Sequence, residues 1–172
     1  MRAFLSLFLS LIFLGSFAQN EHNRGYKVLI GDRCPPFELE IMNGEVLTTS
    51  SLKGKVVVLQ FTASWCGVCR KEMPHLEKEV WLPFKKDDFV LIGIDLKEDK
   101  ETVQAFIEKI GVSYPIGLDT DGSIFEKFTL PNAGVTRNVV LNKEGEIIFL
   151  TRLFEEKEFN EMIDIIEQEL AD

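Results

Sequence analysis

Two cysteines, Cys66 and Cys69, stand three positions apart, and Trp65 comes directly before them. Cysteines at this spacing can close a small disulfide and exchange it with other disulfides. An apolar run precedes the pair and a helical pattern follows it, which places Cys66 at the first turn of a helix. There the helix dipole and the free backbone N–H groups favour the thiolate, the form of cysteine that attacks disulfides. The spacing therefore predicts thiol–disulfide chemistry.

The composition fits a globular protein with one working redox pair. The 172 residues are enough for one domain with a sizeable core. The formal net charge of −9 argues against a nucleic-acid-binding protein, which needs a basic face. Three cysteines are too few for a disulfide scaffold. The third, Cys34, is interpreted as a buried inert thiol, with a third redox partner or an intermolecular disulfide as the alternatives.

The first 18 residues predict a secretory signal peptide. Arg2 gives a positive start, residues 3–17 are mostly apolar, and Ser16 and Ala18 are the small residues of a cleavage site. An uncleaved membrane anchor is the alternative, but the run is short for a span of about 20 apolar residues. We therefore expect a periplasmic or otherwise exported protein, cleaved near Ala18, in a compartment where disulfides persist.

The pattern of apolar residues predicts a single α/β domain over residues 26–172, after a polar linker over residues 19–25. An amino-terminal hairpin is expected around the Asn43-Gly44 turn. Pro74 is expected to kink the first helix. Crossover connections and a final hairpin imply a mixed central sheet with helices on both faces. The predicted elements are hairpin strands at 37–41 and 45–48, further strands at 55–61, 89–94, 138–141 and 147–150, and helices at 66–86, 99–110 and 155–170.

Several stretches of the chain match the pattern of a known family. Residues 61–74 place Trp-Cys-x-x-Cys after a buried strand, and residues 31–37 and 52–55 form an amino-terminal signature. Together with a strand–helix insertion at 93–115, they resemble exported thioredoxin-like thiol–disulfide oxidoreductases of the TlpA type, which include the cytochrome c maturation thioredoxins. The resemblance covers essentially the whole mature chain and implies a thioredoxin-like fold.

The chemistry of the cysteine pair can be divided between its members. Cys66 is the candidate nucleophile, which forms a mixed disulfide with the substrate, and Cys69 is the resolving thiol. A structural zinc site would need four ligands, and the spacing of the remaining cysteine and the two histidines does not supply them. An inert local disulfide is the other alternative. We expect no metal and no dissociable cofactor.

Trp65 is expected to form part of the docking surface or to be a half-buried packing aromatic.

Glu72 follows Cys69 by three positions, so the two lie on one face of the predicted helix. In some cytochrome-maturation members of the resembled family, a glutamate at this place tunes the thiols and moves protons. The resemblance thus implies that Glu72 accepts the proton of Cys69; a solvated helix charge is the alternative. Gln60 stands where cytosolic thioredoxins have a buried aspartate. Because an amide cannot titrate, Gln60 favours Glu72 as the proton-relay group.

The family usually has Gly-Val-Pro where this chain has Gly134-Val135-Thr136. In the family, a cis proline faces the disulfide and the backbone docks substrate as an added strand. A cis bond before a non-proline residue costs about 3–4 kcal/mol, so we expect a trans bond here. Val135 and Thr136 are still expected to line the substrate groove. Arg137 is either a cation near Cys66 that favours its thiolate or a surface arginine.

Three classes of function fit these residues. The first is an exported thiol–disulfide oxidoreductase, mainly a reductase, because Gly67-Val68 lacks the histidine of strongly oxidising relatives. The resemblance implies exported cysteine-containing proteins as substrates, apocytochromes c for example, and a membrane thiol-reductant as electron donor. The second is a thiol peroxidase, in which Cys66 attacks peroxide and Arg137 assists as in peroxiredoxins. The third is a non-enzymatic binding module for a metal or an exported partner.

Overall fold

The computed structural model describes residues 24–171. The predicted signal peptide and most of the predicted linker, residues 19–23, lie outside the described residues. Within residues 24–171, no helix combines the length and the apolar character that a membrane span requires.

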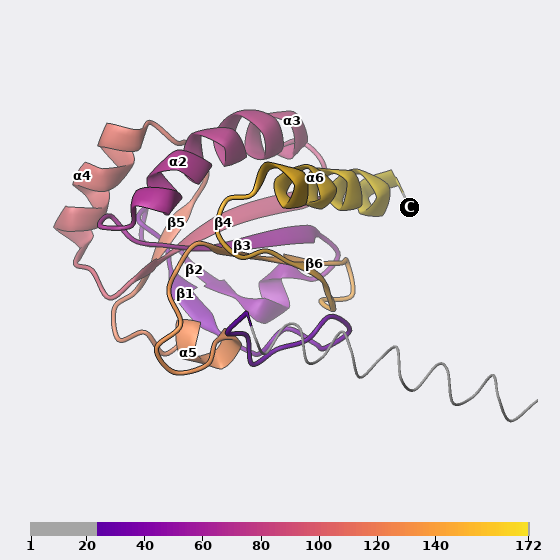
Figure 1. Ribbon diagram of the computed structural model, residues 1–172, viewed down its shortest axis with the longest axis horizontal. Coiled ribbons are helices and arrows are strands. Elements are labelled where there is room, and N and C mark those ends of the chain that lie inside the picture. Colours follow the sequence, from indigo (N-terminus) through magenta and orange to yellow (C-terminus); the bar gives the residue numbers. More distant parts are fainter. Residues whose placement is uncertain (1–23, 172) are drawn as a thin grey trace, which may run out of the picture.

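A five-stranded mixed sheet forms the centre of the protein (Figure 1). Its order is β5-β4-β3-β6-β7; β3, β4 and β5 run parallel, whereas β6 is antiparallel to β3 and β7 is antiparallel to β6. The predicted mixed sheet is thus confirmed, and β5 is an additional strand that the pattern did not predict. The strands are β3 (Val56–Thr62), β4 (Phe89–Leu96), β5 (Ile116–Asp119), β6 (Arg137–Leu141) and β7 (Ile147–Leu150).

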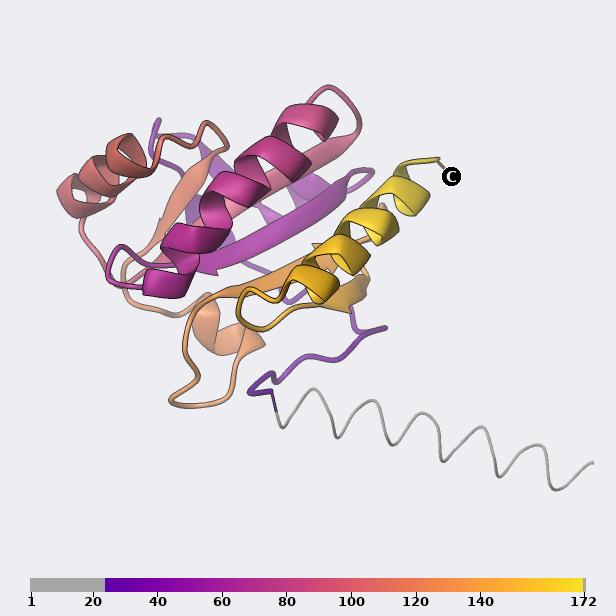
Figure 2. The same ribbon diagram turned by 45° about the horizontal axis from the view of Figure 1, so that its top comes forward.

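Helices lie on both faces of the sheet, as predicted. Figures 1 and 2 show the three longest helices on one face and the hairpin with a short helix on the other. The first face carries α2 (Gly67–His75), α3 (Leu82–Phe84), α4 (Lys100–Ile110) and α6 (Glu156–Ala171). The second face carries β1 (Glu38–Glu40), β2 (Val46–Thr48), a 3-10 turn (Thr49–Leu52) and α5 (Phe125–Phe128).

The helix predicted over residues 66–86 is interrupted near its middle. Pro74 lies inside α2 and has no N–H to donate to the preceding turn. Two residues later the backbone changes to a π-helical segment (Leu76–Trp81), which leads into α3. The irregularity expected from the proline is therefore a local π-helical widening, which is one of the usual sites at which helices bend.

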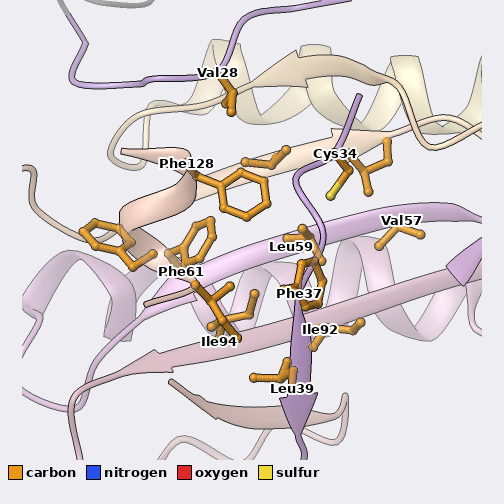
Figure 3. Packing of buried hydrophobic residues seen from close by; sticks show 14 of the residues in the cluster. Val28, Cys34, Phe37, Leu39, Val57, Leu59, Phe61, Ile92, Ile94 and Phe128 are labelled. Carbon is orange, nitrogen blue, oxygen red and sulfur yellow. The ribbon is translucent and has the colours of Figure 1, made fainter. Parts of the chain in front are cut away.

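The central strand β3 is buried along its whole length because both faces of the sheet are covered. Successive side chains of a strand point to opposite faces. Val57, Leu59 and Phe61 belong to the cluster under the hairpin and α5, whereas Val56 and Val58 belong to the cluster under α2, α4 and α6. Figure 3 shows the first cluster, in which Phe61, Leu59 and Phe128 lie close together.

Pairing between β3 and β6 determines where the candidate site forms. Phe61, near the carboxyl end of β3, is the partner of Arg137 at the start of β6. The N–H of Thr136 extends this pairing by donating to the Phe61 carbonyl over 3.0 Å. The loop before β6 therefore lies beside the segment that leads from β3 into α2, which carries Cys66.

The packing of the hairpin on β5 can be tested at Gly117. A Cβ atom at Gly117 would collide with the side chain of Leu39 in β1. We expect Gly117→Ala to lower the free energy of unfolding by about 1–3 kcal/mol because the core is overpacked. Leu39→Ala alone should cost about 2–5 kcal/mol. In urea denaturation the double variant should lose less than the sum of the two, and strict additivity would contradict direct packing.

Candidate functional site

The two cysteines form a disulfide at the amino terminus of α2. Cys66 is the N-cap residue, with an extended backbone, and the helix begins at Gly67. Its Sγ accepts a hydrogen bond from the N–H of Cys69 over 3.2 Å. The Cα atoms of the two cysteines are 5.3 Å apart, which lies within the ordinary range for a disulfide. The predicted place of Cys66 at the first helical turn is thus confirmed.

Exposure distinguishes the residues around the disulfide. Cys66 keeps 9% of its surface exposed, whereas Cys69 is fully buried. An incoming disulfide can therefore reach Cys66 and not Cys69. Trp65 is 61% exposed, so the interpretation of this residue as a half-buried packing aromatic is wrong. Its large apolar surface is therefore exposed next to Cys66 in the chain.

Thr136 lies directly against the disulfide. Its Oγ1 is 3.0 Å from the Sγ of Cys66 and 3.0 Å from the Sγ of Cys69. The Val135–Thr136 bond is trans, as predicted, since residues 24–171 contain no cis peptide bond. Thr136 has a φ of +65°, a left-handed conformation that β-branched residues rarely adopt.

The backbone of this loop is already engaged within the protein. The carbonyl of Thr136 accepts from the N–H of Leu153 over 3.0 Å. The carbonyl of Val135 accepts from Nη1 of Arg152 over 3.2 Å, and the Val135 side chain is buried. The structure thus brings Val135 and Thr136 to the disulfide, with these carbonyls turned inward to protein donors.

Arg137 is buried beside Tyr26, at the start of β6. It is only 1% exposed, so it is not a surface arginine. Its guanidinium carbon lies 4.5 Å from the centre of the Tyr26 ring, and its Nε donates to the carbonyl of Gly134 over 2.9 Å. Among the described residues, the hydrogen bonds to the Cys66 sulfur come from Thr136 and the Cys69 N–H. The contacts of the guanidinium thus run to Tyr26 and Gly134, and among the described residues Arg137 makes no hydrogen bond to the Cys66 sulfur.

Glu72 is buried beneath α2 and is held by two amide side chains. It is 1% exposed, so the alternative of a solvated helix charge is wrong. Nε2 of Gln60 donates to its Oε2 over 3.2 Å, and Nδ2 of Asn138 donates to its Oε1 over 2.8 Å. Burial raises the pKa of Glu72 from 4.5 to about 7, although the two hydrogen bonds oppose the rise. The carboxyl group can therefore take up and release a proton near neutral pH.

Two further polar side chains, Tyr114 and Thr151, extend this buried network. The Tyr114 hydroxyl donates to Oε1 of Gln60 over 2.8 Å, and Asn138 also donates to Oγ1 of Thr151 over 2.9 Å. Burial raises the pKa of Tyr114 well above its ordinary value, and the charge of Glu72 adds to this. Sequence reasoning missed Tyr114, Asn138 and Thr151. The signal for Asn138 is a lone amide at the start of an apolar strand.

Two acidic residues lie near the segment that leads to Cys66, and one of them binds it. Glu98 accepts hydrogen bonds from both the N–H and the hydroxyl of Ser64, the latter over 2.6 Å. Asp95 is fully buried, and its two carboxylate oxygens have no hydrogen-bond partner among the described residues. Burial raises the pKa of Asp95 to about 8, and the neighbouring Glu98 contributes to the rise. Sequence reasoning missed both residues.

The remaining cysteine takes no part in the disulfide. Cys34 is a free, buried thiol packed in the cluster under the hairpin, and Figure 3 shows its sulfur there. Burial raises the pKa of this thiol to about 12, which agrees with the predicted inert role. In the part of the chain that the structure describes, no three histidine, cysteine or acidic side chains gather as a metal site would require.

Comparison with known families and curated proteins gives consistent matches. Residues 30–149 match the AhpC/TSA family. Thiol-disulfide oxidoreductase ResA of Bacillus subtilis is 32% identical over 118 residues, which cover 69% of this chain and 64% of ResA. ResA of Halalkalibacterium halodurans is 31% identical, with 69% and 65% covered. The matched part therefore spans less than two thirds of the length of these relatives.

Solved structures confirm the thioredoxin-like fold. The solution structure of a putative protein disulfide isomerase from Bacteroides thetaiotaomicron is 52% identical and covers 86% of this chain and 94% of its own, with a TM-score of 0.83. StoA from Bacillus subtilis, at 23% identity, covers 76% and 97% with a TM-score of 0.62, which bears on the fold alone. The chain therefore belongs to the AhpC/TSA family, has a thioredoxin-like fold and is similar to the ResA thiol–disulfide oxidoreductases.

Proposed function

We propose that the protein is an exported thiol–disulfide oxidoreductase that works mainly as a reductase of disulfides in exported proteins. The observation that carries this proposal is the asymmetry of the cysteine pair, in which an accessible Cys66 caps a helix and Cys69 is buried behind it. The names of the ResA relatives support the same chemistry. The absence of a histidine between the cysteines supports the reducing direction.

The reaction proceeds by two exchanges that transfer two electrons to the substrate. The Cys66 thiolate attacks one sulfur of the substrate disulfide, so a Cys66–substrate bond forms and the substrate S–S bond breaks. The released substrate thiolate takes up a proton. Cys69 then loses its proton and attacks Sγ of Cys66, which restores the disulfide and expels the second substrate thiolate. A dithiol donor must reduce the pair again, and we expect a membrane thiol-reductant in this role.

Glu72 is the candidate acceptor for the proton that Cys69 loses. The residue shares a helix face with Cys69, and its raised pKa allows it to hold a proton near neutral pH. Gln60 and Asn138 fix the carboxylate with hydrogen bonds, and neither amide can titrate. Glu72 is therefore the titratable member of this trio.

The docking surface consists of Trp65 and the loop that carries Val135 and Thr136. The exposed indole of Trp65 offers apolar contact beside the nucleophile. A substrate segment that pairs with the Val135 carbonyl must share this oxygen with the guanidinium of Arg152 or displace it. Arg137 contributes indirectly, because its bond to the Gly134 carbonyl holds the loop in shape. A peroxidase role for the protein receives no support from Arg137, whose guanidinium stacks on Tyr26.

The two cysteines should respond differently to substitution. In the insulin reduction assay, we expect Cys66→Ser to fall to the background rate because the attacking sulfur is lost. Cys69→Ser should still attack but should accumulate a mixed disulfide, detected as added mass that a reductant removes. Cys34→Ser is the matched control and should retain the wild-type rate, because this thiol is buried and inert. Equal trapping by both single variants would contradict the assigned roles.

The direction of the reaction can be read from the reduction potential of the pair. Equilibration with glutathione should give a value near that of thioredoxin, about −270 mV, if the protein is a reductase. A value near −120 mV, typical of a strong oxidant, would overturn the proposed direction.

The raised pKa of Glu72 predicts a pH-dependent stability. Between pH 4.5 and about 7 the folded protein keeps a proton on Glu72 that the unfolded chain has lost, so stability falls as the pH rises through this window. The difference corresponds to about 3 kcal/mol. We expect Glu72→Gln to remove this part of the fall in urea denaturation. Exposed Glu167→Gln is the control and should follow the wild-type curve; a parallel curve for Glu72→Gln would refute the prediction.

A further inference from the structure

We infer that the Thr136 hydroxyl is the hydrogen-bond donor that stabilises the cysteine thiolates of this protein. The inference rests on the proposed redox function of the pair and assigns a tuning group to it. Proline, which the resembled family usually has at this position, carries no hydroxyl and cannot take this role. At Thr136 this chain therefore has a side-chain donor that a proline would not supply.

The contacts of the hydroxyl involve both reacting sulfurs equally. Oγ1 of Thr136 lies 3.0 Å from each Sγ, within hydrogen-bonding distance of either. Thr136 is almost fully buried, as are Cys69 and most of Cys66. A hydrogen bond to an ionised acceptor is stronger than one between neutral groups, and low local dielectric strengthens it further. The hydroxyl is thus placed where a thiolate would benefit most.

The backbone holds this hydroxyl in position. The Thr136 N–H donates to the Phe61 carbonyl, and its carbonyl accepts from the Leu153 N–H, each over 3.0 Å. Both bonds tie the residue to structured neighbours, although its φ of +65° is unfavourable for a β-branched residue. Such a conformation persists only when the surroundings enforce it, and it is often found at functional sites.

Among the described residues, no other donor forms hydrogen bonds to both sulfur atoms. The N–H of Cys69 donates to Sγ of Cys66 over 3.2 Å. Among the hydrogen bonds of the described residues, the Sγ of Cys69 has only Thr136 as a partner. When Cys69 becomes the attacking thiolate, the Thr136 hydroxyl is therefore the donor in place to stabilise it.

One hydroxyl proton can serve the two sulfurs in turn. In the reduced protein the hydroxyl donates to the Cys66 thiolate, which can only accept. Once Cys66 is bonded to the substrate sulfur, rotation about the Cβ–Oγ1 bond turns the proton to the Cys69 thiolate. Thr136 keeps its proton throughout, and the electrons move only between sulfurs. The hydroxyl thereby favours the attacking species at both exchanges.

The test compares Thr136→Val, which keeps the β-branched shape without the hydroxyl, with Thr136→Ser, which keeps the hydroxyl. The readouts are the pH dependence of alkylation of Cys66 in the reduced protein and the potential of the pair against glutathione. In Thr136→Val we expect the alkylation midpoint to rise by about one pH unit, a tenfold change in thiolate stability. The potential should become about 30 mV more negative, which corresponds to a tenfold change in the equilibrium constant. Thr136→Ser should remain near wild type in both.

Two results would overturn the inference: a Thr136→Val protein with the wild-type midpoint and potential, or a Thr136→Ser protein shifted as far as Thr136→Val. Thermal unfolding confirms that each variant is folded. If Thr136→Val does not fold, Thr136→Ala removes the same hydroxyl and should show the same shifts. Failure of the wild-type protein to reduce insulin would refute the proposed function instead, because alkylation of Cys66 is measured without substrate.

Discussion

The antiparallel pairing of β6 with β3 is the constraint on which the candidate site depends. It places the partners Phe61 and Arg137 opposite each other and draws the N–H of Thr136 onto the Phe61 carbonyl. The loop before β6 is thereby held against the amino terminus of α2, although some 70 residues separate the two in the chain. Without this register the disulfide would lack its neighbouring hydroxyl, and Glu72 would lose its bond from Asn138.

A second consequence of the same register is a group of hydrogen-bonded polar side chains inside the apolar core. Gln60 on β3 and Asn138 on β6 are partners across the sheet. Both amides donate to the carboxylate of Glu72, which α2 carries above them. A buried carboxylate is costly unless its oxygens are hydrogen-bonded. The two amides make the burial of Glu72 tolerable while leaving its proton exchangeable near neutral pH.

Local sequence patterns were sufficient to predict the strand and the helix that position the cysteine pair. The surroundings of the pair depend on strand pairing between distant segments, which local patterns do not reveal. The apolar run of β3 and the helical pattern behind Cys66 predicted the strand and the N-cap position correctly. The strand β5 and the helix α5 are four residues each, too short for a periodic signal. The error at Arg137 has a different cause, because which face of a strand a residue occupies depends on pairing that its neighbours in sequence do not reveal.

The hydrogen bond from Arg152 to the Val135 carbonyl bears on whether other chains can pair with this loop. An extended segment with free carbonyls beside an exposed tryptophan is a template on which other chains can add as a strand. Here the guanidinium of Arg152 and the N–H of Leu153 occupy the carbonyls of Val135 and Thr136. Because protein donors already occupy these two carbonyls, they are less available to pair with a strand of a second copy of the chain.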